Sequence, residues 1–154
     1  MLRKLIALTA AICVAQSASS DTANGTLQVQ AVVLNTCAVA TTPVVFSNLG
    51  VVAGTANGSI TVTCTNTGGF TVALDGGESG DIAARELTHD SVATSFTYQL
   101  YSDAGLTTVW GDGSTGSTVA GTGPLDTIVV YGQTTGTPDT AGTYGDSVQV
   151  TVTF

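Results

Sequence analysis

The amino-acid sequence predicts an all-β domain of the sandwich type. Several short runs alternate apolar and polar residues with a period of two, the pattern of strands that bury one face. In the clearest run, residues 60–65, threonine alternates with Ile, Val and Cys, and β-branched side chains fit a pleated, half-buried surface. Glycine-rich turns separate the runs. About seven short strands joined in this way are typical of a β-sandwich.

The expected strands follow one another along the chain. Between them, the stretch 78–90 is polar and shows only a weak helical pattern, over residues 82–87. No repeat of the length found in solenoid proteins is evident. The expected strands cover residues 25–34, 43–46, 60–65, 70–74, 95–101, 106–110, 125–131 and 144–154.

The first of these strands, Gly25 to Leu34, precedes the first cysteine of the predicted domain. One face carries Leu27, Val29, Ala31 and Val33, and the other carries Thr26, Gln28 and Gln30. A leading strand in this position can either fold into its own domain or fill a gap in a neighbouring molecule. We favour the second interpretation and expect residues 21–36 to act as a donor strand.

The chain begins with the features of an export signal. Arg3 and Lys4 form a basic head, residues 5–14 are apolar, and small residues suit a cleavage site near 17–20. The apolar run is too short for a permanent membrane anchor, so we expect no membrane insertion. The expected organisation is a signal peptide over residues 1–20, the donor strand over 21–36 and a β-sandwich over 37–154.

The exported chain is strongly acidic. After removal of the signal, Arg85 is the one remaining Lys or Arg against eleven carboxylates, a formal net charge of −10. Such a surface repels phosphate groups, which argues against nucleic acid as a partner. The same charge argues against binding to a membrane surface through basic residues.

Two cysteines, Cys37 and Cys64, remain in the exported chain. An even count in an exported protein predicts one disulfide, worth about 3–4 kcal/mol in the chain-entropy model. Zinc is the competing use of cysteine, but it needs about four ligands, and the chain has a single histidine, His89. We therefore expect a disulfide and no metal or other cofactor.

Catalytic chemistry finds little support. No Gly-x-Ser-x-Gly motif occurs, and His89 lies in a polar stretch where we expect it to be solvated. Four acidic residues lie close in sequence and could serve glycoside hydrolysis or hold calcium, but the spacing does not match an EF-hand, and Asp–Gly turns commonly separate strands. These acids are Asp75, Glu78, Asp81 and Glu86. We expect no enzymatic activity, and we expect Arg85 to pair with one of these acids at the surface.

Three aromatic residues bear on a possible binding role. Trp110, Tyr98 and Tyr101 could together form a patch that stacks against carbohydrate. The alternation along residues 95–101 instead places Tyr98 in the core and Tyr101 on the surface.

The last expected strand ends on an apolar face made by Val148, Val150, Val152 and Phe154. The sequence stops there, at the point where another strand of an immunoglobulin-like sandwich would follow. We therefore expect an incomplete immunoglobulin-like β-sandwich, in which a missing strand leaves an apolar slot along an open edge. A spare strand at the other end of the chain matches this deficit.

Three stretches make the chain resemble a known family: Val-Ala-Leu-Asp-Gly-Gly-Glu at 72–78, Tyr-Gln-Leu-Tyr-Ser-Asp-Ala at 98–104, and Gly-Asp-Ser-Val-Gln-Val-Thr-Val-Thr-Phe at 145–154. They resemble the spore coat U domain family, which includes the pilin subunits of archaic (Csu-type) chaperone–usher pili. The likeness extends over nearly the whole exported chain.

The resemblance implies a structural pilus subunit that a periplasmic chaperone holds until an outer-membrane usher replaces the chaperone strand with a neighbour's leading strand. Head-to-tail copies of itself or related pilins would then form a surface fibre used in adhesion and biofilm formation. Carried onto this sequence, the donor face is Leu27, Val29, Ala31 and Val33, the acceptor edge is Val148, Val150, Val152 and Phe154, and the disulfide joins Cys37 to Cys64. The chain has no room for an added receptor-binding domain, which favours a shaft subunit, major or minor.

Physical estimates make such an exchange plausible. Each large apolar side chain inserted contributes about 1.5–3 kcal/mol, and about ten main-chain hydrogen bonds add about 0.5–1.5 kcal/mol each. The gross total of about 10–15 kcal/mol before ordering costs is enough for a persistent joint. The alternative is a self-contained secreted module, either a spore-coat component or a carbohydrate- or protein-binding β-sandwich, whose leading strand folds into its own sheet.

Overall fold

The computed structural model describes residues 20–47, 49–50 and 52–154, so the expected signal peptide lies outside the described residues except for Ser20. The chain divides into two units, residues 1–32 and 33–154. In the first unit, residues 20–32 form neither helix nor strand, and their side chains are exposed. The second unit is the folded domain.

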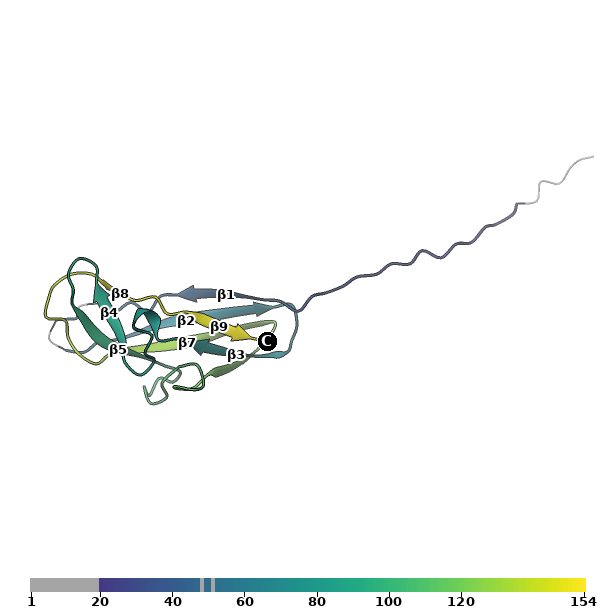
Figure 1. The fold of residues 1–154 in the computed structure, drawn as a ribbon. Helices are drawn as coiled ribbons and strands as arrows, with labels where there is room; N and C mark the ends of the chain where they lie inside the picture. The colour runs from purple at the N-terminus through teal and green to yellow at the C-terminus, as the bar shows by residue number, and fades with distance from the viewer. Residues whose placement is uncertain (1–19, 48, 51) are drawn as a thin grey trace, which may run out of the picture. The chain divides into compact units, whose positions relative to one another are not determined.

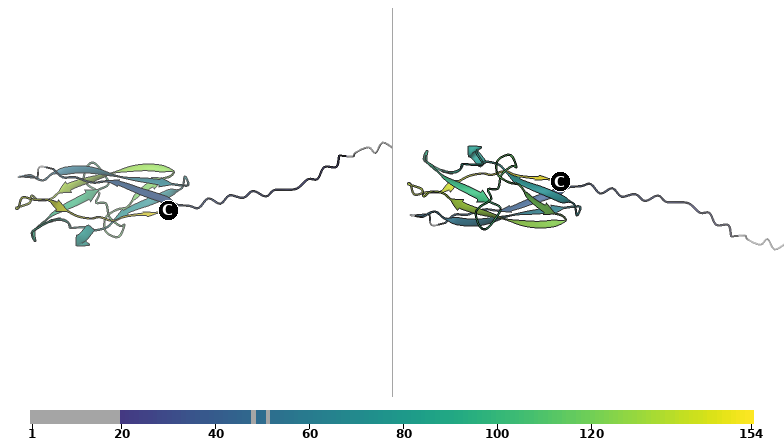
Figure 2. Two further views of the ribbon diagram at one scale, coloured as in Figure 1. Left: turned by 90° about the horizontal axis from the view of Figure 1, so that it is seen from above. Right: turned by 90° about the horizontal axis from the view of Figure 1, so that it is seen from below.

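The described residues of the domain form nine strands in two sheets (Figures 1 and 2). The larger sheet has six strands in the order β1-β2-β7-β5-β4-β8, and the smaller has three in the order β6-β3-β9. Every strand pair is antiparallel. The strands are β1 (Cys37–Thr42), β2 (Thr55–Cys64), β3 (Gly69–Leu74), β4 (Arg85–His89), β5 (Ser95–Tyr101), β6 (Val119–Thr122), β7 (Leu125–Thr134), β8 (Tyr144–Gly145) and β9 (Val150–Thr153). The prediction of an all-β fold is confirmed.

Four of the expected strands correspond to β2, β3, β5 and β7. The strand expected over 43–46 is wrong. The strand at this place is β1, which ends at Thr42, and the next residue, Pro43, has no N–H to donate to a neighbouring strand. The final expected strand, 144–154, is divided into β8 and β9. Strands β1, β4 and β6 were not expected.

The expected strand over 106–110 is also wrong. Leu106 has a φ of 56°, in the left-handed region that β-branched and bulky residues avoid. The Asp103 carboxylate accepts hydrogen bonds from the backbone N–H groups of Thr107 and Thr108, which fixes a loop. Only Val109 and Trp110 form isolated bridges.

The weak helical pattern over 82–87 does not become a helix. The one short 3-10 turn in the described residues is η1 (Gly77–Ser79), and Arg85 already begins β4.

The core between the two sheets is mainly apolar and includes Trp110, whose indole N–H donates to the Val72 carbonyl at 3.0 Å. Trp110 is fully buried, so it cannot stack against a surface carbohydrate. Tyr98 is buried, as expected from the alternation, and Tyr101 is half-buried. The other buried apolar residues around Trp110 are Ile60, Val62, Cys64, Phe70, Val72, Leu74, Leu100 and Val130.

Arg85 lies inside this core, and the expectation of a surface ion pair is wrong. Its side chain is fully buried and donates to the Gln99 amide oxygen at 2.5 Å, to the Asp75 carbonyl at 2.6 Å and to the Trp110 carbonyl at 2.9 Å. Burial lowers the pKa of Arg85, while the nearby Tyr98, Asp75 and Asp146 oppose the shift. The planar guanidinium donates hydrogen bonds to acceptors on three separate segments, and an apolar side chain at this position would leave those acceptors without a donor.

We predict that Arg85→Met destabilises the domain by at least about 3 kcal/mol, because each buried acceptor that loses its donor costs about 1–3 kcal/mol. Urea unfolding followed by the fluorescence of Trp110, the single tryptophan of the chain, measures this loss. Asp139→Asn, which removes an exposed charge, is the control and should change stability by less than about 0.5 kcal/mol. Equal unfolding midpoints for the two variants would contradict the structural role of Arg85.

Candidate functional site

The directions of the strands define two ends of the domain. β1 and β7 both begin beside the end of β2, with Cys37 opposite Cys64 and Leu125 opposite Thr63. We call this end the root pole, because the leading segment (residues 21–36) joins the domain there. We call the opposite end, where β1 and β7 finish, the far pole. β3 follows the end of β2 and so also begins at the root pole, like β1. Because β9 is antiparallel to β3, it runs opposite to β1 and ends at the root pole (Figure 1).

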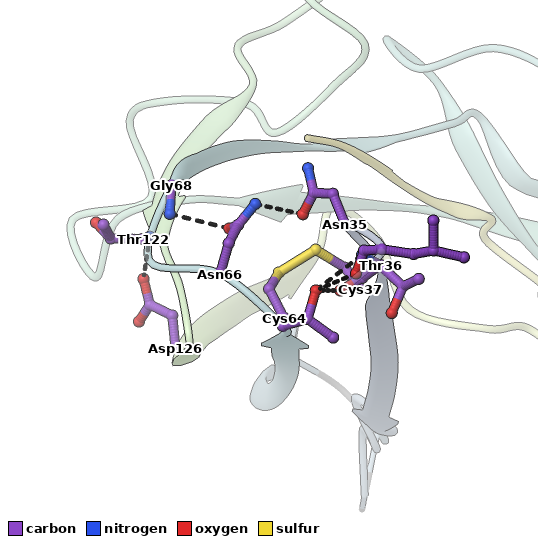
Figure 3. Close-up of a disulfide and its surroundings, with 10 residues drawn as sticks. Asn35, Thr36, Cys37, Cys64, Asn66, Gly68, Thr122 and Asp126 are labelled. Carbon is purple, nitrogen blue, oxygen red and sulfur yellow. Dashed lines mark hydrogen bonds between the residues drawn. A yellow bond between two sulfur atoms is a disulfide. The ribbon is translucent and has the colours of Figure 1, made fainter. Parts of the chain in front are cut away.

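The root pole is held by the disulfide and by a set of hydrogen bonds (Figure 3). Cys37 and Cys64 are joined with an S–S distance of 2.08 Å. Beyond the disulfide, the Thr36 carbonyl accepts from the Thr65 N–H at 2.9 Å, and the Thr65 hydroxyl donates to the Leu34 carbonyl at 2.8 Å. The side chains of Asn35 and Asn66 are also hydrogen-bonded. The chain therefore continues the line of β1 outward, instead of turning back at the cysteine.

The four residues expected to form the donor face lie in the leading segment. Leu27, Val29 and Val33 are 86%, 83% and 79% exposed, and Ala31 is exposed as well. None of them belongs to a strand in the isolated chain. A row of exposed apolar side chains of this size is typical of a surface that binds a partner.

A cleft opens between β1 and β9, the neighbouring edges of the two sheets. Its volume is about 380 Å³, and its floor is the core itself, including Ile60, Leu100 and Val130. Val148 and Val150 line one side, and residues 41–44 line the other. Apolar core side chains are thus reachable from one edge of the sandwich.

The structure places only some of the residues expected at the acceptor edge beside the cleft. Val148 and Val150 line the cleft, and Val152 is half-buried against the core. Phe154 is 53% exposed and lies beside a separate shallow hollow with Phe70. The structure thus brings Val148 and Val150 to the cleft but not Phe154.

A polar group that sequence reasoning missed lies at one end of the cleft. The Tyr98 hydroxyl donates to Asp146 Oδ2 at 2.6 Å, while Asp146 Oδ1 accepts from the backbone N–H groups of Glu78 and Ser147 at 2.8 and 2.7 Å. Burial, and next the hydrogen bond to Asp146, raises the pKa of Tyr98. The phenol therefore stays a hydrogen-bond donor, and it fixes the segment that leads into β9. Nothing in the sequence links these two residues, which lie 48 positions apart.

The residues considered for catalysis or metal binding have other roles. The His89 side chain is 7% exposed, not solvated as expected, and its ring packs edge-on against Tyr144 with centroids 4.8 Å apart. Its Nδ1 accepts a hydrogen bond from the Ser91 N–H at 3.0 Å.

The carboxylates of Asp75 and Asp81 in the acidic turn likewise accept hydrogen bonds from backbone N–H groups. Asp75 Oδ1 accepts from the N–H groups of Gly77 and Gln149, and Asp81 Oδ1 accepts from that of Ala83. Within the described part of the chain, no group of three or more His, Cys, Asp or Glu residues is placed to hold a metal ion. No helix in that part is long and apolar enough to cross a membrane.

Solved structures with a similar fold include two from bacterial pili. One is a chaperone–tip adhesion subunit pre-assembly complex from the archaic chaperone-usher Csu pili of Acinetobacter baumannii, with a TM-score of 0.58 and 24% identity over 79% of this chain. The match covers 40% of that chain, so this protein spans less than half of its length. The other is the minor tip subunit of the E. coli Hda pilus, with a TM-score of 0.44 and 16% identity over 75% of this chain and 79% of that one. No curated protein sequence matches the chain.

The family comparison agrees with the three motifs found in the sequence. The model of the Spore Coat Protein U domain matches residues 23–151, which include residues 23–36 of the leading segment, both bonded cysteines and the first half of β9. The chain therefore belongs to the spore coat protein U domain family.

Proposed function

We propose that this protein is a structural subunit of a chaperone–usher surface fibre, and that its leading segment inserts into the cleft of the next copy. The proposal rests chiefly on one observation: the same chain carries an open cleft over its core and an exposed strand-like segment of apolar residues. The cleft lacks a strand beside β9, which is an edge of the smaller sheet. Insertion would pair that edge and cover the core at the same time.

Strand direction favours insertion between molecules over insertion within one. The leading segment is rooted at the root pole, where β9 ends, so a segment folded back into its own cleft would run parallel to β9. A neighbour's segment is free to run antiparallel, as every other strand pair of the domain does, and antiparallel pairing is slightly more stable per residue. The hydrogen bonds of Leu34 and Thr36 to Thr65 also extend the β1–β2 pairing past the cysteines to residues 34–36.

This arrangement leads to a fibre. Each copy would donate at its root pole and accept in its cleft, and a head-to-tail contact of this kind repeats without closing. Three large apolar side chains of the donor face, Leu27, Val29 and Val33, would leave water at about 1.5–3 kcal/mol each. The joint would therefore persist without a covalent bond.

The partners of the proposed subunit are copies of itself or related pilins, a periplasmic chaperone and an outer-membrane usher. Family membership and the fold shared with the Acinetobacter baumannii complex, which contains a chaperone and a pilus subunit, support this part of the proposal. The chain would be exported through the periplasm to a surface fibre that serves adhesion and biofilm formation, and its role would be structural, without catalysis.

We predict that Val29→Asp abolishes polymers, because insertion would bury an unpaired carboxylate in the core. Gln28→Asp is the matched control, since it adds the same charge one residue away on the opposite face of the segment and should leave polymers intact. The measurement is denaturing gel electrophoresis of unboiled exported protein, on which polymers resistant to the detergent appear as a ladder. A normal ladder from Val29→Asp would remove the donor assignment.

A mixing experiment tests the cleft. Val148→Asp should block insertion into the cleft but leave the leading segment able to insert. Val29→Asp should block insertion of the leading segment but leave the cleft able to accept one. Neither variant should therefore polymerise alone. Mixed together, they should give dimers and nothing longer, because the one productive pair uses the intact segment of the first and the intact cleft of the second. Buried-tryptophan fluorescence checks that both variants are folded.

The alternative of a self-contained binding module makes the opposite prediction for the same gels. Unmodified protein would then stay monomeric at high concentration and would unfold cooperatively without a partner. The exposed leading segment disfavours that alternative, and the full burial of Trp110 disfavours its carbohydrate-stacking form.

A further inference from the structure

The end of the leading segment nearest the domain is apolar on both faces. Residues 31–34 read Ala-Val-Val-Leu, and Val32 and Leu34 are 85% and 71% exposed. In an extended strand they lie on the face opposite Val33, the face that carries Gln28 and Gln30 farther out. If the donor face fills the cleft, Val32 and Leu34 point away from it and require another partner.

A second hollow lies at the far pole, formed by the segment that follows β1 and the segment that leads into β8. Its volume is about 560 Å³. The apolar and aromatic residues that line it include Val45, Phe46, Leu87, Phe96, Pro138 and Tyr144. Val45 lies beside this hollow and is 64% exposed.

The two hollows are neighbours. Val44, Phe46 and Leu87 line both the cleft beside β9 and the far-pole hollow. A strand lying in the cleft therefore points toward the second hollow at the far pole.

Strand direction decides which end of the incoming segment arrives there. An inserted segment antiparallel to β9 begins near the root pole, where β9 ends, and reaches the far pole with its last residues. Residues 27–33 extend over about 20 Å, whereas residues 148–153 extend over about 17 Å. With Leu27 paired near Thr153, at the end of β9, the residues after Val33 would lie beyond Val148, toward the far-pole hollow.

We propose that the far-pole hollow receives Val32 and Leu34 from the leading segment of the neighbouring copy. This inference rests on the proposed function, since it needs the segment to insert. It adds a second contact to each joint, outside the cleft, between the root of one subunit and the far pole of the next. The contact would limit the angle between successive subunits.

Cross-linking tests the contact directly. A Leu34→Cys protein mixed with a Val45→Cys protein should form covalent dimers that survive boiling without reductant. The matched control is Leu34→Cys mixed with Leu125→Cys, because Leu125 is equally exposed, at 64%, but lies at the root pole. This control mixture should form no more covalent dimer than Leu34→Cys alone.

The outcomes separate this inference from the proposed function. Polymers on unboiled gels without the 34–45 cross-link would overturn the far-pole contact and leave strand insertion standing. A cross-link between residues 34 and 125 of different copies would overturn it as well, since the segment would then run parallel to β9. An absence of polymers from the unmodified protein would overturn both.

A second pair of variants measures the effect on the joint. Val32→Asn with Leu34→Asn should still polymerise, because the donor face is intact, but its polymers should dissociate about tenfold or more faster on heating. Gln28→Asn with Gln30→Asn changes the same face farther from the root and should leave the dissociation rate unchanged. Equal rates for the two double variants would contradict the contact.

Discussion

The unequal size of the two sheets is the constraint on which the rest of the structure depends. Six strands form one layer and three form the other, so the smaller sheet leaves part of the core uncovered along β9. Ile60 and Val130, from the middle of the larger sheet, therefore form the floor of a cleft instead of the centre of a closed sandwich. One additional strand beside β9 would supply the missing cover, and an isolated chain pays for its absence in stability.

Two sets of polar contacts lie beneath and beside the cleft. Arg85 donates to the Gln99 amide oxygen and to the carbonyl groups of Asp75 and Trp110, while Asp146 accepts from the Tyr98 hydroxyl and two backbone N–H groups. These bonds have preferred lengths and directions, unlike apolar contacts, so the Asp146 set fixes the segment that leads into β9 against β5 and η1. One border of the cleft therefore begins at a segment held by polar contacts.

The sequence predicted the elements whose side chains alternate between core and solvent, such as β2 and β5. It missed β1, which is almost wholly exposed along its length, and it misplaced Arg85, because a lone cation in an acidic chain resembles a surface residue. The partners that allow Arg85 to be buried lie 10 to 25 positions away and meet it only in the folded chain. The sequence also led us to expect a slot beside the final strand, and Val148 and Val150 do line the cleft, whereas its other side, residues 41–44, was not expected there. The donor role of the leading segment stays a prediction.

The order of strands in the chain also explains why donor and acceptor would not meet in one molecule. The leading segment joins β1, one border of the cleft, at the root pole. β9, the other border of that cleft, ends at the same pole, and this makes the self-paired arrangement parallel. A neighbour approaching at the far pole meets neither restriction, and its root would come to rest against the apolar hollow there. The polarity of a single strand thus favours a head-to-tail fibre over a closed monomer.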